Sequence, residues 1–486
     1  MSAANANIRQ AIVQASVSLD QAQAIGQHPP GFTYVPPTHA RALDLDATLV
    51  EGMRGAGKSF WWGSLVLPEH RSFVQNGFPE ARLPDNVAVA QGFGTGSVNT
   101  SYPDAEQLID LVNHFRPRSI WRAVIALHAG FQGGFSRLST WGQRVQWVQA
   151  NSELFAQELD AADRRLESHS EKLLVLFDAL DRLADDWQHI RPLAKGLLQV
   201  ALDMRSTRNI RCKVYVRPDI LEDEQIVSFP DYSKLNAAKA SLRWQRADLY
   251  ALLFQCIGNA SVGSNEFRKL VYECLGLRVP RQPNAKTWVL PTPLRVDEDL
   301  QEALFEQLAG RAMGSSTKRG KPYTWLVNHL QDGRNQVSPR SFFAALKTAA
   351  NESHDVDEMA IGYRGIQRGV QEASMIRVTE IAEDYPWVKL IMQPLSGNLT
   401  VPCTTKEIEV IWKRERTVET LDSTLRRQGS AAKLPPQHLE QGTSGILTDL
   451  ESLGMLNRLE NKRVQMPDVY RVAFGLGRRG GVKPLK

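Results

Sequence analysis

Short apolar runs alternate with longer amphipathic stretches between residues 47 and 216. A short apolar run is typical of a buried strand, and apolar residues spaced three or four apart are typical of a helix. Their alternation predicts an α/β fold in which helices cover both faces of a parallel sheet. The predicted strands are residues 48–51, 86–90, 123–127, 173–177 and 212–216, and the predicted helices include 104–115, 152–166 and 190–205.

The pattern outside this segment is mainly helical. Residues 8–24 predict one helix, and a proline-containing link follows that cannot be helical. We expect residues 1–45 to form an N-terminal extension that packs on the α/β core. Further helices are predicted at residues 242–257, 266–275, 302–308 and 339–350.

One motif lies between the first predicted strand and a helix predicted from residue 59. It reads Gly52-Met53-Arg54-Gly55-Ala56-Gly57-Lys58-Ser59 and fits the pattern G-x-x-x-x-G-K-[ST]. Such a loop binds nucleotide phosphates, because its glycines allow backbone N–H groups to turn inward around an anion. Lys58 is expected to bind the β- and γ-phosphates and Ser59 to ligate Mg²⁺. The expected cofactors are ATP and Mg²⁺, and the expected nucleotide contacts are Gly52, Arg54, Gly55, Ala56, Gly57, Lys58, Ser59 and Phe60.

A second glycine-rich run, residues 92–96, has no lysine after it. We expect it to form a surface turn rather than a second phosphate-binding loop.

A carboxylate follows the predicted strand 173–177, whose five consecutive apolar residues are typical of a strand buried on both faces. Asp178 therefore lies at the carboxyl end of the strand, where open α/β sheets bind ligands. We expect it to hold Mg²⁺ opposite Ser59. The alternative is a structural ion pair with a nearby arginine.

The residue after this carboxylate is Ala179. Many ATP-hydrolysing proteins carry an acidic residue there to orient the attacking water, so we expect slow turnover. Asp181 can take this role if a helix begins immediately. It can equally cap that helix or pair with Arg182.

Two arginines are candidate phosphate sensors. Arg217 ends the last predicted strand just before Pro218, and is placed to distinguish ATP from ADP. Arg340 lies in the first turn of the predicted helix 339–350, where a lone cation is unfavourable unless it serves an anion. A purely structural role is the alternative for each.

The motif Gly-x-Arg-Gly-x-Gly-Lys-Ser at residues 52–59 and Asp-x-x-Asp-Arg at residues 178–182 resemble AAA/STAND-type P-loop ATPases. They are similar to those of origin-recognition-type ATPases and KAP-type NTPases. Residues 214–219, 229–235, 244 and 337–346 resemble a poorly characterised bacterial ATPase family found with large accessory gene clusters. The resemblance implies that Arg217 is sensor 1 and Arg340 is sensor 2. It departs from the origin-recognition pattern at Ala179.

The resemblance also implies a four-part organisation: an N-terminal extension (1–45), a P-loop ATPase core (46–240), a helical lid (241–395) and a winged-helix-like domain (396–486). In the last part, helices are predicted at 405–413, 418–427 and 442–453, and a wing at 455–466. Residues 404–486 carry 15 Lys or Arg and 10 Asp or Glu, which accounts for the net charge of +5. Nucleic acid is thus a candidate partner, with Lys462, Arg463, Arg478 and Arg479 contacting phosphates. Winged helices also dock proteins.

Composition limits the class of protein and its cellular location. The chain has 486 residues, 42% hydrophobic and 23% charged, and no apolar run approaches the length of a membrane span. No secretory signal is visible at the N-terminus. The four cysteines are scattered, which argues against a zinc site or a disulfide framework. We expect a cytoplasmic protein without membrane contact.

The leading hypothesis is an ATPase that uses ATP binding and slow hydrolysis to switch conformation and partner binding. Its expected catalytic residues are Lys58, Asp178, Asp181 and Arg217. Protein partners from a multi-gene system are expected, with phage defence or mobile-element maintenance as the role, and a homo-oligomer is left open. The alternatives are a DNA-binding loader or regulator that uses the winged helix, and a nucleotide-stabilised scaffold without turnover.

Overall fold

The computed structural model describes residues 2–21, 28–94, 100–184, 186–282, 286–353, 358–429 and 432–484. They form two compact units. Unit 1 comprises Met1–Asp20, Gly31–Tyr34 and Trp244–Lys486, and unit 2 comprises Gln21–Pro30 and Val35–Arg243. We describe each unit by itself, and the predicted four-part division stays a prediction.

Among the described residues, no helix combines the length and the apolar character that a membrane crossing requires.

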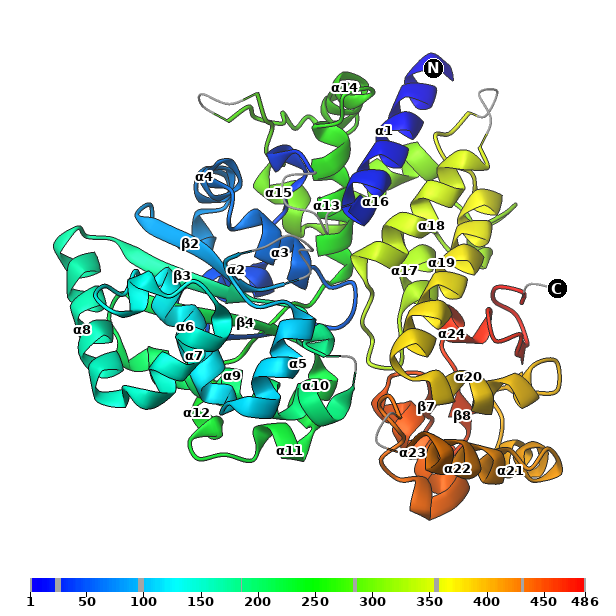
Figure 1. Ribbon diagram of the computed structural model, residues 1–486. Helices are drawn as coiled ribbons and strands as arrows, with labels where there is room; N and C mark the ends of the chain where they lie inside the picture. The colour runs from blue at the N-terminus through cyan, green and yellow to red at the C-terminus, as the bar shows by residue number, and fades with distance from the viewer. Residues whose placement is uncertain are drawn as a thin grey trace. The chain divides into compact units, whose positions relative to one another are not determined.

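Unit 2 is built on a five-stranded sheet with the strand order β2-β3-β4-β1-β5 (Figure 1). Every pairing in it is parallel. The predicted α/β class with a parallel sheet is therefore confirmed. The strands are β1 (Leu49–Glu51), β2 (Val87–Phe93), β3 (Lys172–Phe177), β4 (Ile210–Val216) and β5 (Ala240–Ser241).

The strands alternate with helices. Those of unit 2 are α2 (Pro37–Leu43), α3 (Lys58–Ser64), α4 (Pro68–Gly77), α5 (Ala105–His114), α6 (Pro117–His128), α7 (Trp141–Ala150), α8 (Ser152–Ser168), α9 (Trp187–Asp203), α10 (Pro218–Glu222), α11 (Glu224–Val227) and α12 (Tyr232–Ala237).

Helices cover both faces of the sheet, as the register shows. Phe177 pairs with Val214, and Leu176 pairs with Lys213. Successive side chains of a strand point to opposite faces. The Phe177 ring meets Trp121 of α6 with 5.7 Å between ring centroids. Lys213 instead donates to the carbonyl of Ala42 in α2, so α6 and α2 lie on opposite faces.

Two predictions within this segment are wrong. Residues 123–127, predicted as a strand, lie in α6 and are mostly buried. A short apolar run is the same in a buried strand and a buried helix, so periodicity does not distinguish them. The fifth strand is instead β5, which is too short to give a pattern. Gly92 and Phe93 end β2 and are buried with Gly94 rather than forming a surface turn, whereas residues 95 and 96 lie outside the described residues.

Unit 1 is mainly helical. Its helices are α1 (Ser2–Gln21), α13 (Arg246–Gly258), α14 (Ser264–Leu275), α15 (Thr292–Val296), α16 (Glu298–Ala309), α17 (Pro322–Leu330), α18 (Pro339–Asn351), α19 (Tyr363–Asp384), α20 (Pro386–Met392), α21 (Thr405–Arg414), α22 (Thr417–Gln428), α23 (Gly442–Ser452) and α24 (Asp468–Arg471).

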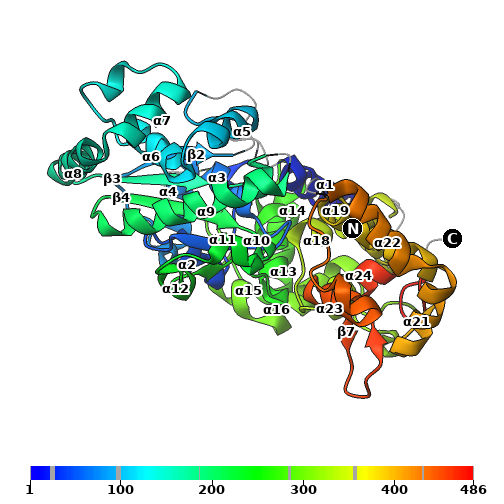
Figure 2. The same cartoon turned by 60° about the horizontal axis from the view of Figure 1, so that its bottom comes forward.

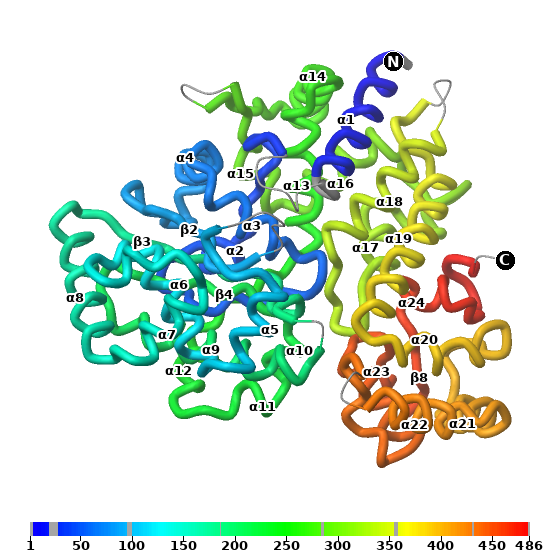
Figure 3. Tube along the Cα trace, viewed as in Figure 1, coloured from blue at the N-terminus to red at the C-terminus, as the bar shows by residue number. Residues whose placement is uncertain are grey.

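The helices α18 and α19 run alongside each other (Figure 3). Their backbones approach closely where Gly369 faces Ala345. A Cβ atom at position 369 would lie 2.1 Å from the Ala345 carbonyl oxygen, which is far inside van der Waals contact. Only glycine allows this approach.

The predicted packing of the N-terminal extension is corrected in part. Helix α1 belongs to unit 1, where Ser16 donates to the Phe343 carbonyl of α18 at 3.1 Å and Arg9 to the Ala360 carbonyl at 3.0 Å. Helix α2, by contrast, belongs to unit 2. The sequence pattern shows that α1 has an apolar face, but it does not show which surface covers that face.

The C-terminal part of unit 1 has its own apolar core, which includes Trp387, Trp412 and Tyr470. Helices form at the three predicted places, as α21, α22 and α23. The predicted wing contains an antiparallel hairpin, β7 (Asn457–Arg458) with β8 (Val464–Gln465) (Figure 2). Its second strand also bridges to Cys403. The assignment of these elements to a winged helix stays a prediction.

A buried lysine fastens the segment before β1 to the sheet. Lys213 is fully buried, and its ammonium group donates to the carbonyls of Ala42, Asp44 and Ala47, each at 2.7 Å. These acceptors belong to the end of α2 and the link that leads into β1. An ammonium group has three N–H donors, so these bonds satisfy it fully.

Replacing Lys213 by methionine tests this role. Lys213→Met removes three hydrogen bonds, at about 1 kcal/mol or more each, although the Asp44 carbonyl keeps the Ala47 N–H as a donor. We expect unit 2 to lose about 3 kcal/mol, a fall in melting temperature of roughly 6–12 °C. Thermal unfolding followed by circular dichroism measures this. The control is Lys172→Met at the exposed start of β3, and equal melting temperatures for the two variants would refute the role.

Candidate phosphate-binding site

The predicted phosphate-binding loop joins β1 to α3 at the carboxyl edge of the sheet. The Gly52 N–H donates to the Val216 carbonyl at 3.0 Å, which ties the start of the loop to the end of β4. The Ala56 N–H donates to the Met53 carbonyl at 3.1 Å and closes a turn. Gly55 and Gly57 have φ angles of 78° and 101°, which favour glycine. The loop therefore has the backbone conformation that its glycines allow.

Lys58 bends back over this loop. Its ammonium group donates to the carbonyls of Gly52 at 2.8 Å and Met53 at 3.0 Å. Burial lowers the pKa of Lys58 to about 8 and Arg217 acts in the same direction, against the opposing effect of nearby carboxylates. An anion that replaced the two carbonyls would therefore meet a positive group that is poorly solvated.

Asp178 lies directly after β3 and is 2% exposed. Ser59 and the backbone of Ala179 lie close enough to its carboxylate to stabilise the charged form. One carboxylate oxygen, Oδ1, is buried and has no hydrogen-bond partner among the described residues. The pKa of Asp178 is raised, because burial outweighs the stabilising effects of Ser59 and Lys58. The structure thus brings Ser59, Lys58 and Asp178 together, as the sequence predicted.

This arrangement fits a hard cation. A buried carboxylate oxygen without a partner is costly and calls for an ion or a water. Serine hydroxyl and carboxylate oxygens are ligands that Mg²⁺ accepts. Ser59 and Asp178 are therefore the residues that would hold Mg²⁺.

Ala179 has an unusual backbone conformation, with φ 57° in the left-handed region. A 3₁₀ turn, Leu180–Arg182, begins at the next residue. An immediate helical turn is the condition on which the sequence analysis expects Asp181 to serve the site. The Asp181 carboxylate lies 3.3 Å from Nη1 of Arg217. Burial raises the pKa of Asp181, but Arg217 and Lys58 outweigh burial, and the net pKa is lowered. A carboxylate with a lowered pKa is a weak base.

Arg217 follows β4 and is 7% exposed. Besides Asp181 it binds Asp219 with two parallel bonds, from Nε at 2.9 Å and from Nη2 at 3.0 Å. Sequence reasoning did not include Asp219 among the site residues. The available signal was the spacing Arg-Pro-Asp, because Pro218 fixes the backbone between the two charged residues.

The remaining predicted contacts lie on the loop and on α3. Arg54 is half-buried on the loop. The Phe60 ring packs against His28, with 4.4 Å between ring centroids, and against Trp61. Both are placed in unit 2 with the loop, but nothing in their contacts distinguishes nucleotide binding from packing.

Arg340 lies in unit 1. Its guanidinium donates to the Glu380 carboxylate on α19 at 2.6 Å, and Glu380 also pairs with Arg377. The anion that Arg340 was expected to need is thus supplied within unit 1. Its role as a second sensor stays a prediction.

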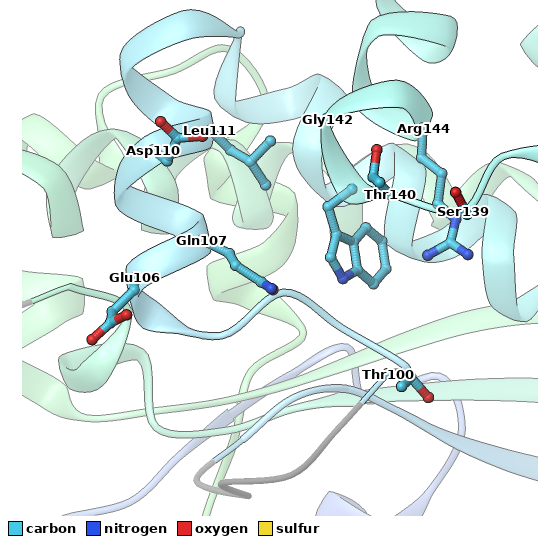
Figure 4. Close-up of a pocket in the computed structure, with 10 residues that line it drawn as sticks. Thr100, Glu106, Gln107, Asp110, Leu111, Ser139, Thr140, Gly142 and Arg144 are labelled. Atoms are coloured by element: carbon cyan, nitrogen blue, oxygen red, sulfur yellow. The ribbon is translucent and has the colours of Figure 1, made fainter.

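A separate cavity of about 610 Å³ lies between α5 and α7 (Figure 4). Its α5 wall includes Glu106, Gln107 and Asp110, and its opposite wall includes Thr140 and Arg144. None of the predicted site residues lines it, so it is distinct from the phosphate-binding loop.

The helix that precedes the predicted wing is not basic. Helix α23 contains no Lys or Arg. Its two carboxylates pair with His438 and Arg458. Arg463 donates to the Pro402 carbonyl, and Arg478 pairs with Asp468. Nucleic-acid binding therefore stays a prediction for which these contacts add no support.

No family model matches this chain, and no curated protein matches it either. Five chains among the solved structures match it, two of which follow. The Aeropyrum pernix ORC2 protein, in ADPNP and ADP complexes, is 14% identical with a TM-score of 0.31, over 90% of this chain and 93% of that one. Cdc6p from Pyrobaculum aerophilum is 10% identical with a TM-score of 0.29, over 92% of this chain and 93% of that one. Both are proteins of the origin-recognition type that the motifs of this chain resemble.

The unpaired oxygen of Asp178 leads to a prediction. Asp178→Asn removes a buried charge. Without nucleotide, the variant should therefore be as stable as the parent or more stable by up to about 1 kcal/mol. The stabilisation by Mg²⁺ and ATP together should be lost. Thermal unfolding with and without these ligands measures both effects. Asp203→Asn is the control, because it removes the partner of Arg118 and Arg122 and should lower stability without affecting the ligand response.

Proposed function

We propose that the chain binds ATP with Mg²⁺ at the loop of unit 2 and hydrolyses it slowly, as a nucleotide-dependent switch. The observation that carries the proposal is the partnerless buried oxygen of Asp178 beside Ser59 and Lys58. A purely structural ion pair would leave no such oxygen. Mg²⁺, held by Ser59 and Asp178, would neutralise part of the phosphate charge.

The chain's own residues have separate tasks. Lys58 exchanges its two carbonyl partners for phosphate oxygens, and the glycine loop offers backbone N–H groups to them. Arg217, at the end of β4, is available to a terminal phosphate if it leaves its carboxylates. Asp181 accepts a proton from the attacking water only weakly, because its pKa is lowered. Slow hydrolysis follows from this last point and from the absence of an acidic side chain at position 179.

The biological role rests on the resemblance alone. A multi-component bacterial system with protein partners, and phage defence or mobile-element maintenance within it, are what we infer from that family. DNA loading through the C-terminal helices and a scaffold without turnover remain the alternatives.

Loss of the lysine tests nucleotide binding. Lys58→Ala removes a charged group that makes one or two bonds to phosphate, each about 1.5–3 kcal/mol. We expect ATP affinity to fall at least about tenfold, measured by isothermal titration calorimetry with a non-hydrolysable analogue. Lys172→Ala, at the exposed start of β3, is the matched control. Intact binding in the Lys58 variant would refute the proposal.

Asp181→Asn tests turnover. The side chain keeps its shape and loses its capacity to accept a proton. We expect steady-state phosphate release to fall about tenfold, less than the roughly 10²–10⁴-fold usual for a general base, because the lowered pKa makes Asp181 a weak base. Analogue binding should be largely retained. Phosphate release that is absent in the parent and unaltered in the variant would favour the scaffold.

A further inference from the structure

Arg217 and Asp219 form an ion pair near the phosphate-binding loop. It is bidentate, at 2.9 and 3.0 Å, and the two side chains are 8% and 15% exposed. Bidentate pairs of this kind are roughly twice as strong as neutral hydrogen bonds. The bond from Arg217 to Asp181 is single and longer, at 3.3 Å. Of these two carboxylates, Asp219 therefore binds Arg217 more strongly.

Local chain geometry favours this pairing. Arg217 is the last residue before α10, and Pro218 occupies the first position of that helix. The proline ring fixes its own φ angle, so Asp219 follows at a set distance in the first helical turn. The two charged side chains are held together without any rearrangement of the sheet.

Several charged groups act on Lys58. The carboxylates of Asp178, Asp181 and Asp219 favour its positive charge, whereas Arg217 opposes it. Arg182 acts in turn on Asp181. Each of the three carboxylates repels a polyphosphate that approaches the loop, so together they oppose its binding.

We propose that Asp219 is a positioning residue that keeps the Arg217 guanidinium away from the phosphate site. This inference rests on the proposed function: the terminal phosphate of ATP competes with Asp219 for the guanidinium. ADP has no γ-phosphate and leaves the pair intact. Asp219 thereby lowers the preference of the site for triphosphate over diphosphate. Its carboxylate also makes Mg²⁺ more necessary for binding, because it repels the phosphates.

The inference makes a specific prediction for Asp219→Asn. The variant keeps the shape of the side chain and removes its charge, so Arg217 is released toward phosphate. We expect the ratio of affinities for the ATP analogue and ADP to rise about tenfold, a size typical of coupling between two binding events. Calorimetric titration of both nucleotides at fixed Mg²⁺ gives this ratio.

Two controls separate this role from a structural one. Asp223→Asn removes a carboxylate that pairs with Arg191 at 2.8 Å, outside the set around Lys58, and should leave the ratio unchanged. Arg217→Gln combined with Asp219→Asn should abolish the gain, because Asp219 acts through Arg217. Asp219→Ser replaces Asp219→Asn should the latter fail to fold, with the same expectation.

The outcomes are distinct. An unchanged ratio in Asp219→Asn, or a gain that survives loss of Arg217, overturns this inference while the parent still binds the analogue. A parent protein that binds neither nucleotide overturns the proposed function and this inference together.

Discussion

Parallel pairing of β1 with β4 is the constraint on which the site depends. It sets Gly52 against Val216, so the phosphate-binding loop starts where β4 ends. Pairing of β4 with β3 then brings Asp178 to the same edge. Apolar side chains fix this register, because a slip by one residue would turn a buried face outward. The packing of apolar side chains therefore determines where the charged side chains lie around Lys58.

This edge concentrates charge in a place that water reaches poorly. The carboxylates of Asp178 and Asp219 differ in their contacts. Asp178 has one oxygen without a partner among the described residues, whereas Asp219 binds Arg217 through both oxygens. Such an edge is unfavourable for an isolated protein and favourable for one that binds a cation and an anion together. Natural proteins keep unfavourable polar groups mainly where function uses them.

The sequence pattern predicted the strands and the charged residues that follow them, but not all of the contacts that these residues make. The strand ends carrying Asp178 and Arg217 were predictable, since long apolar runs followed by a charged residue have few alternatives. Residues 123–127 were misassigned because an apolar run has the same pattern in a buried helix. The ion pair of Asp219 and the buried bonds of Lys213 were not predicted, because both depend on side-chain partners that come together only in the folded chain.

The division of the chain also constrains the order of folding. Helix α1 packs with α18 in unit 1, where Ser16 and Phe343 meet across 327 residues of sequence. The stretch Val35–Arg243, which holds the whole sheet, lies between them. On a ribosome, unit 2 can fold as soon as it has emerged, whereas α1 must wait until α18 has been made. Helix α1 thus precedes the sheet in synthesis but reaches its neighbours in unit 1 only after the sheet is complete, and its apolar face stays exposed throughout that interval.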